Sequence, residues 1–205
     1  MAASYLDHGL GEFLDLVAKR QPAPGGGAVT AVAVSLAASL VAMAARYSAD
    51  RIDDGWGLVD EAERLRARAA SLADADAKAY GAVIAAYDSV RGSDDVDMRE
   101  QLRVALTCAA EVPLEVAESG AETARMAARL AVKGKRDVRG DAVTALLLAE
   151  AATRSAAGLV AINVEAGGGD PEFVRRTARC VTTARDAAAS VEQDGERRRG
   201  VRPRS

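Results

Sequence analysis

The stretch that decides the fold carries no charge and runs from Pro22 to Ala45, PAPGGGAVTAVAVSLAASLVAMAA. It opens with a turn, because two prolines stiffen the backbone ahead of three consecutive glycines. The stretch is mostly Ala, Gly, Ser and Thr, and small side chains allow helices to pack closely. The stretch is long enough to span a bilayer. It contains few large apolar residues, however, so we expect a buried central helix over residues 28–47 and no membrane span.

Helical spacing of apolar residues extends outward from this stretch over almost the whole chain, without convincing strand alternation. Ser4 is a possible cap of the first helix, Pro113 should end or kink the fourth, and Asp170 with Pro171 should begin the last. The pattern predicts an all-helical fold, a single-domain multihelical bundle over residues 1–194 and a disordered basic tail over residues 195–205. The expected helices cover residues 5–18, 28–47, 58–87, 96–132, 141–164 and 171–191.

The amino-acid composition argues against several classes of protein. The net charge of the 205 residues is −3, which argues against a general nucleic-acid binder, a class that is usually basic. The arginine-rich end of the chain is interpreted as frayed, with nucleic-acid contact the minority interpretation. Two cysteines, Cys108 and Cys180, make no disulfide framework, and the first residues lack a signal-peptide pattern. We therefore expect a cytoplasmic protein with reduced thiols.

The glycine turn is the most site-like feature of the sequence. Pro24 leads into Gly25, Gly26 and Gly27, which let a ligand approach the backbone, and the helix that follows would point free N–H groups at an anion or a polar ligand edge. A tight turn between packed helices explains the same residues. The turn matches neither the phosphate-binding loop nor the dinucleotide fingerprint, so no ATP or NAD is inferred.

One charge interrupts the inward stripe of the third expected helix. Asp76 is the only charged member of the stripe, whereas Asp74 falls on the other side and is expected to be solvated. A carboxylate on a buried face is costly unless it is paired, so Asp76 is either functional or a structural partner of Tyr or Arg. The stripe consists of Leu58, Ala62, Leu65, Ala69, Leu72, Asp76, Tyr80, Val83 and Tyr87.

The helix after residue 140 offers two more polar candidates. Asn163 ends an otherwise small or apolar stripe of Ala142, Ala149, Ala156 and Val160. It could hydrogen-bond a heterocycle or a nearby backbone group. Asp141 stands where an N-cap is expected, and that structural role is the simpler one. Glu150 and Arg154 have the spacing of a surface or interface ion pair.

A basic loop precedes this helix. Lys133, Lys135, Arg136 and Arg139 could grip carboxylates, although charged loops are usually only solvated. His8 is the only histidine and lies far in sequence from the other candidates. A histidine-based triad, a histidine-rich metal site and a zinc site are therefore not expected, and no metal is assigned.

Four segments, in order along the chain, resemble the family of formimidoyltetrahydrofolate cyclodeaminases and methenyltetrahydrofolate cyclohydrolases. They are FLDLVAKRQPAPGGGAVTAVAVSLAASLVAMAA (13–45), LADADAKAYGAVIAAY (72–87), VPLEVAE (112–118) and GKRDVRGDAVTALLLAEAATRSAAGLVAINV (134–164). The resemblance implies an all-helical, intertwined homodimer that handles tetrahydrofolate one-carbon units. Carried over residue by residue, it implicates Pro24, Gly25, Gly26, Gly27, Asp76, Asp141 and Asn163.

The resemblance implies a lyase or hydrolase acting on C–N bonds, with no cofactor beyond the tetrahydrofolate substrate. In this interpretation Asp76, with Asp141 as the next candidate, manages protons, while the glycine turn and Asn163 hold the pterin. Lys135 and Arg136 would take the glutamate tail. Cyclodeamination of 5-formimidoyltetrahydrofolate to 5,10-methenyltetrahydrofolate and ammonia is the first expectation. The cyclohydrolase and a non-catalytic folate-binding or scaffold protein are the alternatives, and membranes and nucleic acids are not expected partners.

Three positions depart from the family pattern. Residues 45–48 and 88–90 differ from the polar segments usual there, and Leu159 stands in place of the first of two asparagines near the end of the penultimate helix.

Overall fold

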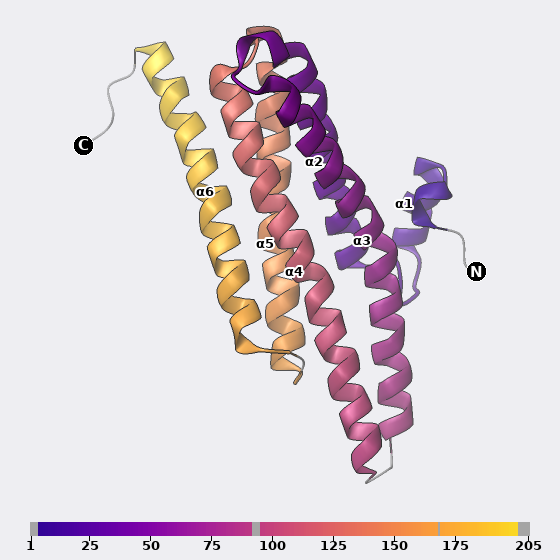
Figure 1. The fold of residues 1–205 in the computed structure, drawn as a ribbon. Coiled ribbons are helices and arrows are strands. Elements are labelled where there is room, and N and C mark those ends of the chain that lie inside the picture. Colours follow the sequence, from indigo (N-terminus) through magenta and orange to yellow (C-terminus); the bar gives the residue numbers. More distant parts are fainter. Residues whose placement is uncertain (1–3, 92–94, 168, 201–205) are drawn as a thin grey trace.

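The structure, a computed structural model, describes residues 4–91, 95–167 and 169–200. It confirms the all-helical fold, and no strand occurs among those residues (Figure 1). The α-helices are α1 (Leu10–Ala18), α2 (Gly26–Ser48), α3 (Gly55–Val90), α4 (Val96–Lys133), α5 (Arg139–Glu165) and α6 (Pro171–Arg199). Short 3-10 turns are η1 (Tyr5–Asp7), η2 (Ala49–Arg51) and η3 (Arg136–Val138).

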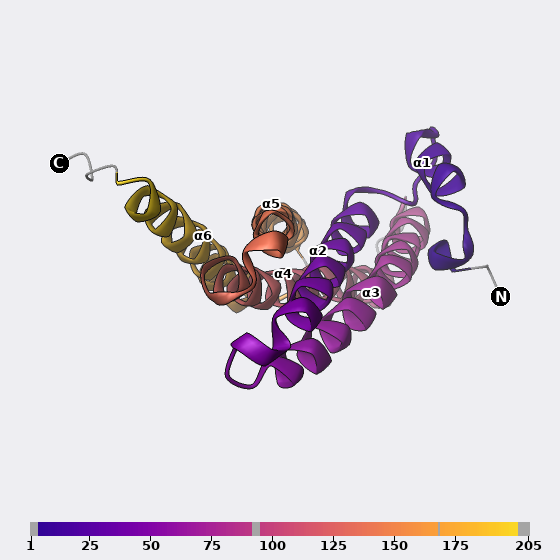
Figure 2. The ribbon, with the colours of Figure 1, turned by 90° about the horizontal axis from the view of Figure 1, so that it is seen from above.

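Five long helices make the bundle. α4 packs against α3, α5 and α6, while α2 lies between α3 and α5 and also touches α4. Seen from above, α1 stands beside the bundle, at the end where α2 begins (Figure 2). α1 is anchored mainly through Phe13, whose buried ring meets Tyr5 edge-on.

The core is built from small side chains. Alanines of α2, α3, α4 and α5, such as Ala38, Ala62, Ala127 and Ala149, are fully buried. Because alanine adds little bulk, helix axes can approach closely along most of their length. The same shortage of bulk means that each helix removes only limited apolar area from water.

α2 is central, as the sequence predicted, but one side of it is uncovered. Ala31, Val34 and Val41 are fully buried, whereas Leu36 and Tyr47 on the opposite side are each 57% exposed. By length and composition alone, residues 26–51 and 136–165 could each cross a membrane. The core helices of a folded domain pass the same test, and the inner sides of both segments are packed in this bundle.

Several helix boundaries differ from the predicted ones. The expected first helix is two elements, because Ser4 caps only η1 and the chain extends at His8 and Gly9 before α1 begins. Of the two outcomes predicted for Pro113, an end or a kink of the helix, the first is wrong, since α4 continues through it. Asp170 caps α6 as predicted, with Pro171 in the first turn. α6 continues to Arg199, so residues 195–199 of the expected tail are helical, and residues 201–205 lie outside the described part of the chain.

Candidate active site

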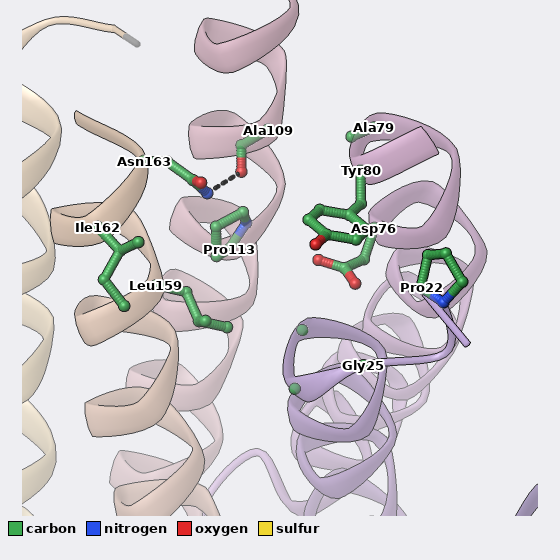
Figure 3. Close-up of a pocket in the computed structure, with 12 residues that line it drawn as sticks. Pro22, Gly25, Asp76, Ala79, Tyr80, Ala109, Pro113, Leu159, Ile162 and Asn163 are labelled. Carbon is green, nitrogen blue, oxygen red and sulfur yellow. Dashed lines mark hydrogen bonds between the residues drawn. The ribbon is translucent and has the colours of Figure 1, made fainter. Parts of the chain in front are cut away.

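A cavity of about 280 Å³ opens where the N-terminus of α2 meets the middle of α3 and α4 and the end of α5 (Figure 3). Asp76 is its only charged lining residue. The lining consists of Pro22, Gly25, Gly26, Gly27, Asp76, Ala79, Tyr80, Ala109, Pro113, Leu159, Ile162 and Asn163. The structure thus brings the glycine turn, Asp76 and Asn163 together, although they are far apart in sequence. Pro24 is buried and is not among the lining residues.

The glycine turn and Asp76 fit one another directly. A Cβ atom built on Gly27 would overlap the carboxylate of Asp76, so only glycine at this position leaves room for the carboxylate where it lies. The Asp76 carboxylate accepts a hydrogen bond from the backbone N–H of Ala28, in the first turn of α2. The sequence predicted an anion or a polar ligand edge at this helix N-terminus, and in the structure the protein's own Asp76 carboxylate lies there.

Half-burial of Asp76 has a chemical consequence. Burial raises the pKa of the Asp76 carboxyl above its usual range, and the hydrogen bond from Ala28 opposes that effect only in part. A carboxylate with a raised pKa is a stronger base than an exposed one. Such a group, in a cavity with apolar walls, can accept and return a proton.

Asp74 does not lie free in solvent, and the expectation that it does is wrong. Its carboxylate accepts hydrogen bonds from the Ser4 hydroxyl at 2.5 Å and from the Tyr5 N–H at 2.9 Å. These bonds fasten η1 to α3 at a residue only two positions before Asp76. Burial, followed by the charges of Asp74 and Asp76, raises the pKa of Tyr5.

Asn163 bonds backbone, but not at the glycines that follow α5. Its Nδ2 donates to the carbonyl oxygen of Ala109 at 2.7 Å (Figure 3). Pro113 has no N–H, so the Ala109 carbonyl four residues earlier lacks its usual helical partner. Asn163 supplies the missing donor, which lets α4 continue through Pro113. Among the described residues no group donates a hydrogen bond to the Oδ1 of Asn163, and Asn163 lines the cavity.

Tyr80 and Leu159 are site residues that sequence reasoning did not select. Tyr80 follows Asp76 by one turn of α3, and its ring lies beside the carboxylate (Figure 3). Leu159 precedes Asn163 by one turn of α5 and faces the cavity from the other side. The four-residue spacings could have found both, because residues four apart share a helix face.

The remaining candidates lie at the far end of the bundle. Lys135 and Asp141 line a separate shallow depression with Met43, Tyr47, Asp137 and Val138. The Lys135 N–H bonds the Ser48 hydroxyl at the C-terminus of α2, whereas the cavity is at its N-terminus. α2 has 23 residues and is therefore about 34 Å long. Because of this separation, none of the three residues Asp141, Lys135 and Arg136 reaches the Asp76 cavity of the same chain.

Two structural interpretations at this end also change. Asp141 is not the N-cap of α5, because the helix begins at Arg139 and Asp141 lies in its first turn. Glu150 and Arg154 form no ion pair, since their charged groups are not within 4.0 Å. Arg139 is engaged within the fold, donating to the Ala131 carbonyl and lying 3.8 Å from Asp194. Both cysteines are free thiols.

Metal ligands are not gathered anywhere in the described ranges: no three His, Cys, Asp or Glu side chains there are placed to hold an ion.

Comparison with known proteins connects this geometry to a family. Residues 9–183 match the family described as Formiminotransferase-cyclodeaminase. The chain belongs to this family. It is 30% identical over 161 residues to the methenyltetrahydrofolate cyclohydrolase of Methylorubrum extorquens, and the match covers 75% of this chain and 77% of that protein. The formimidoyltransferase-cyclodeaminase of Rattus norvegicus is 33% identical over 124 residues, which cover 57% of this chain but only 23% of the longer rat protein.

A solved structure shares the fold of this family member. The formiminotetrahydrofolate cyclodeaminase of Thermotoga maritima superposes with a TM-score of 0.77 and 26% sequence identity, over 94% of this chain and 96% of that chain. The resemblance read from the four sequence segments is therefore confirmed at the level of family and fold.

Proposed function

We propose that this chain is an enzyme that makes or breaks a C–N bond at the carbon bridging N5 and N10 of tetrahydrofolate. The observation that carries the proposal is a single half-buried carboxylate, Asp76, at the wall of a small cavity between Tyr80 and Leu159. We further propose hydrolysis of 5,10-methenyltetrahydrofolate to the 10-formyl compound as the reaction. The relative that matches this chain over most of both lengths is named as a cyclohydrolase.

The residues suggest how the hydrolysis would proceed. The methenyl substrate is a cation, which favours the ionised form of a neighbouring carboxylate despite its burial. Asp76 accepts a proton from water as the water oxygen bonds to the bridging carbon. The bond from that carbon to N5 then breaks, and the proton held by Asp76 goes to N5. As the formyl C=O forms, the remaining hydroxyl proton is lost to solvent, and this released proton balances the loss of positive charge from the substrate.

The cavity suits the bicyclic head of the substrate. The Tyr80 ring on one side and Leu159 and Ile162 on the other provide walls for a flat ring. The Oδ1 of Asn163 can accept a hydrogen bond from the heterocycle, and the glycine turn admits the ring edge close to the backbone. Holding water, carbon and base in one geometry supplies much of the catalysis.

Cyclodeamination is the second candidate, since the rat relative and the Thermotoga structure carry that name. In that reaction N10 attacks the formimino carbon, ammonia leaves, and Asp76 would carry the proton between the two nitrogens. The same residues serve both reactions because both pass through a tetrahedral carbon between N5 and N10.

One assay separates the candidates. The purified chain is mixed with 5,10-methenyltetrahydrofolate or with 5-formiminotetrahydrofolate, and the methenyl absorbance is followed. A hydrolase lowers the absorbance of the first substrate faster than buffer does, whereas a cyclodeaminase raises the absorbance of the second. A chain that binds either compound without changing the absorbance would be a folate-binding or scaffold protein, and the proposal would fail.

The setting proposed for this activity is a cytoplasmic homodimer without further cofactors, metal, membrane or nucleic acid. Support for the dimer comes from the apolar side chains that α2 and α5 leave uncovered, including Leu36, Leu147 and Ile162, at 57%, 54% and 62% exposed. A solution mass that stays monomeric at all concentrations would contradict it.

A further inference from the structure

The segment that precedes α2 is fastened to α3. We call residues 4–25 the N-terminal strap, and it consists of η1, α1 and the turn that leads into α2. At its beginning the Ser4 hydroxyl donates to one oxygen of the Asp74 carboxylate at 2.5 Å, and the Tyr5 N–H donates to the other oxygen at 2.9 Å. Asp74 precedes Asp76 by two residues, so the strap begins within one turn of α3 from the carboxylate of the cavity.

The strap ends at the same carboxylate. Pro22 lines the cavity, and Gly25 is the residue from which α2 starts. Gly27 leaves room for the Asp76 carboxylate, and the Ala28 N–H donates to it. This N–H is in the first turn of α2, where backbone donors have no partner within the helix. Both ends of the strap therefore adjoin the elements that hold Asp76.

Few other contacts hold the strap. Among the described residues, no hydrogen bond or ion pair joins residues 6–21 to the helices α2 to α6, because those that residues 6–21 form stay within the strap. Phe13 is the one buried residue of α1, and its ring meets Tyr5 edge-on, with 6.0 Å between the ring centroids. α1 has nine residues and is too short to be stable as an isolated helix. Its place beside the bundle therefore depends on the attachment at Tyr5 and Asp74.

The ring of Tyr5 connects this attachment to the interior. It is half-buried and packs on a cluster of buried residues that includes Ala28 of α2 and Ala73 of α3. Burial, and after it the charges of Asp74 and Asp76, raise the pKa of the Tyr5 phenol, so the phenol lies within electrostatic range of both carboxylates. A displaced Tyr5 would therefore disturb the cluster to which Ala28 belongs.

We propose that Asp74 is a positioning residue, which fastens the N-terminal strap to α3 and thereby fixes the Asp76 carboxylate on the Ala28 N–H. The fastened strap also keeps Pro22 in the wall of the cavity. Asp74 is not among the residues that line the cavity, so it acts on a bound substrate only through its neighbours. The effect on turnover rests on the proposed function, whereas the effect on the contact between Asp76 and Ala28 does not.

Hydrogen exchange of backbone amides tests the positioning without reference to activity. In Asp74→Ala the amides of α1 should exchange about tenfold faster or more, because hydrogen bonds to a charged group are lost and a detached α1 unfolds. The Ala28 amide, whose acceptor is Asp76, should lose protection by a similar factor. The amides of α4 should be unchanged, as should all amides in Asp60→Ala, the matched control with an exposed carboxylate on α3. Unchanged protection of α1 or of Ala28 in Asp74→Ala would overturn the proposal.

Two variants of Ser4 keep the test decisive if Asp74→Ala does not fold. Ser4→Ala removes one of the two bonds to Asp74 and leaves α3 unaltered, so the amides of α1 and of Ala28 should lose protection to a smaller extent. Ser4→Thr keeps the hydroxyl and should restore the protection seen in the wild type. Equal protection in Ser4→Ala and Ser4→Thr would overturn the proposal.

Steady-state kinetics show whether Asp74 acts through Asp76. Asp74→Ala should lower kcat by about tenfold or more and change KM by less than about threefold, because the base is misplaced while most of the cavity wall remains. In an Asp76→Asn background the same substitution should have little further effect, since the carboxylate to be positioned is gone. Losses in kcat that multiply in the double variant would overturn the proposal. If the wild-type chain lacks turnover, the proposed function fails, while hydrogen exchange still decides whether Asp74 positions Asp76.

Discussion

At the N-terminus of α2 a carboxylate is held in an apolar cavity, whereas at the C-terminus of the same helix Lys135 and Arg136 lie on an open surface. Burial at the first end raises the pKa of Asp76, which is useful for moving protons. Solvated cations at the second end are suited to recognising carboxylates. The two ends thus differ in chemistry and are separated by the length of α2, which has 23 residues.

The largest expected effect is at the buried end. Asp76→Asn should lower turnover by roughly two to four orders of magnitude, the usual contribution of a general acid–base group, while the fold and folate binding change little. Steady-state kinetics with circular dichroism and ligand titration measure this. Asp60→Asn, an exposed position on the same helix, is the control and should be silent. Full turnover in Asp76→Asn would move the proton chemistry to the other end, with Asp141 as the next candidate.

The second effect concerns the fit between Gly27 and Asp76. Gly27→Ala should displace the carboxylate from the Ala28 N–H and lower turnover by about 10²-fold, since a misplacement of about 1 Å can cost that much. Gly81→Ala, on α3, is a matched control, because nothing lies within 4 Å of a Cβ atom there and Gly81 is not among the lining residues of the cavity. Equal activity of the two variants would show that the close approach at Gly27 has no functional role.

The sequence predicted the helices well, and it singled out Asp76, which the structure places at the cavity, for a physical reason. Apolar residues recur with the period of an α-helix, and Asp76 interrupts one such apolar stripe. The periodicity alone therefore singles out Asp76. The structure adds the reason for Gly27, which is an overlap between atoms of α2 and α3. No spacing within a single helix can reveal a contact between two helices.

The predictions from sequence were wrong where hydrogen bonds to the backbone decide the local structure. Pro113 was expected to end or kink its helix, but the helix does not end there, because Asn163 of α5 donates to the carbonyl that the proline leaves without a partner. Asp74 was expected in solvent because periodicity does not show that η1 folds back onto α3. The separation of Asp141 from Asp76 also escaped prediction, since motifs along a sequence give no distance in space.

A third, smaller effect should appear in stability. Asn163→Ala leaves the Ala109 carbonyl without a donor and should lower the free energy of unfolding by about 1–3 kcal/mol in chemical denaturation. Pro113→Ala supplies an N–H to the same carbonyl, so the loss caused by Asn163→Ala should shrink in the double variant. A double-mutant cycle measures this coupling. Additive effects would mean that Asn163 stabilises the fold by some other contact.

The smallest effect is a pH dependence specific to Asp76. Because burial raises its pKa in the folded state, the folded chain holds this proton more tightly than the unfolded chain, whose carboxyl titrates near 3.8. The resulting contribution to stability is complete below that value and is lost as pH rises through the folded pKa. Asp76→Asn removes this titration while keeping an oxygen that can accept from Ala28. Thermal melts from about pH 4 to pH 7 should therefore show the variant gaining on the wild type as pH increases. Other ionisable groups are common to both proteins and largely cancel in the difference. If the difference in melting temperature between the two proteins stays constant over this range, Asp76 titrates in the folded chain as it does in the unfolded one. The two ends of α2 would then differ in geometry alone.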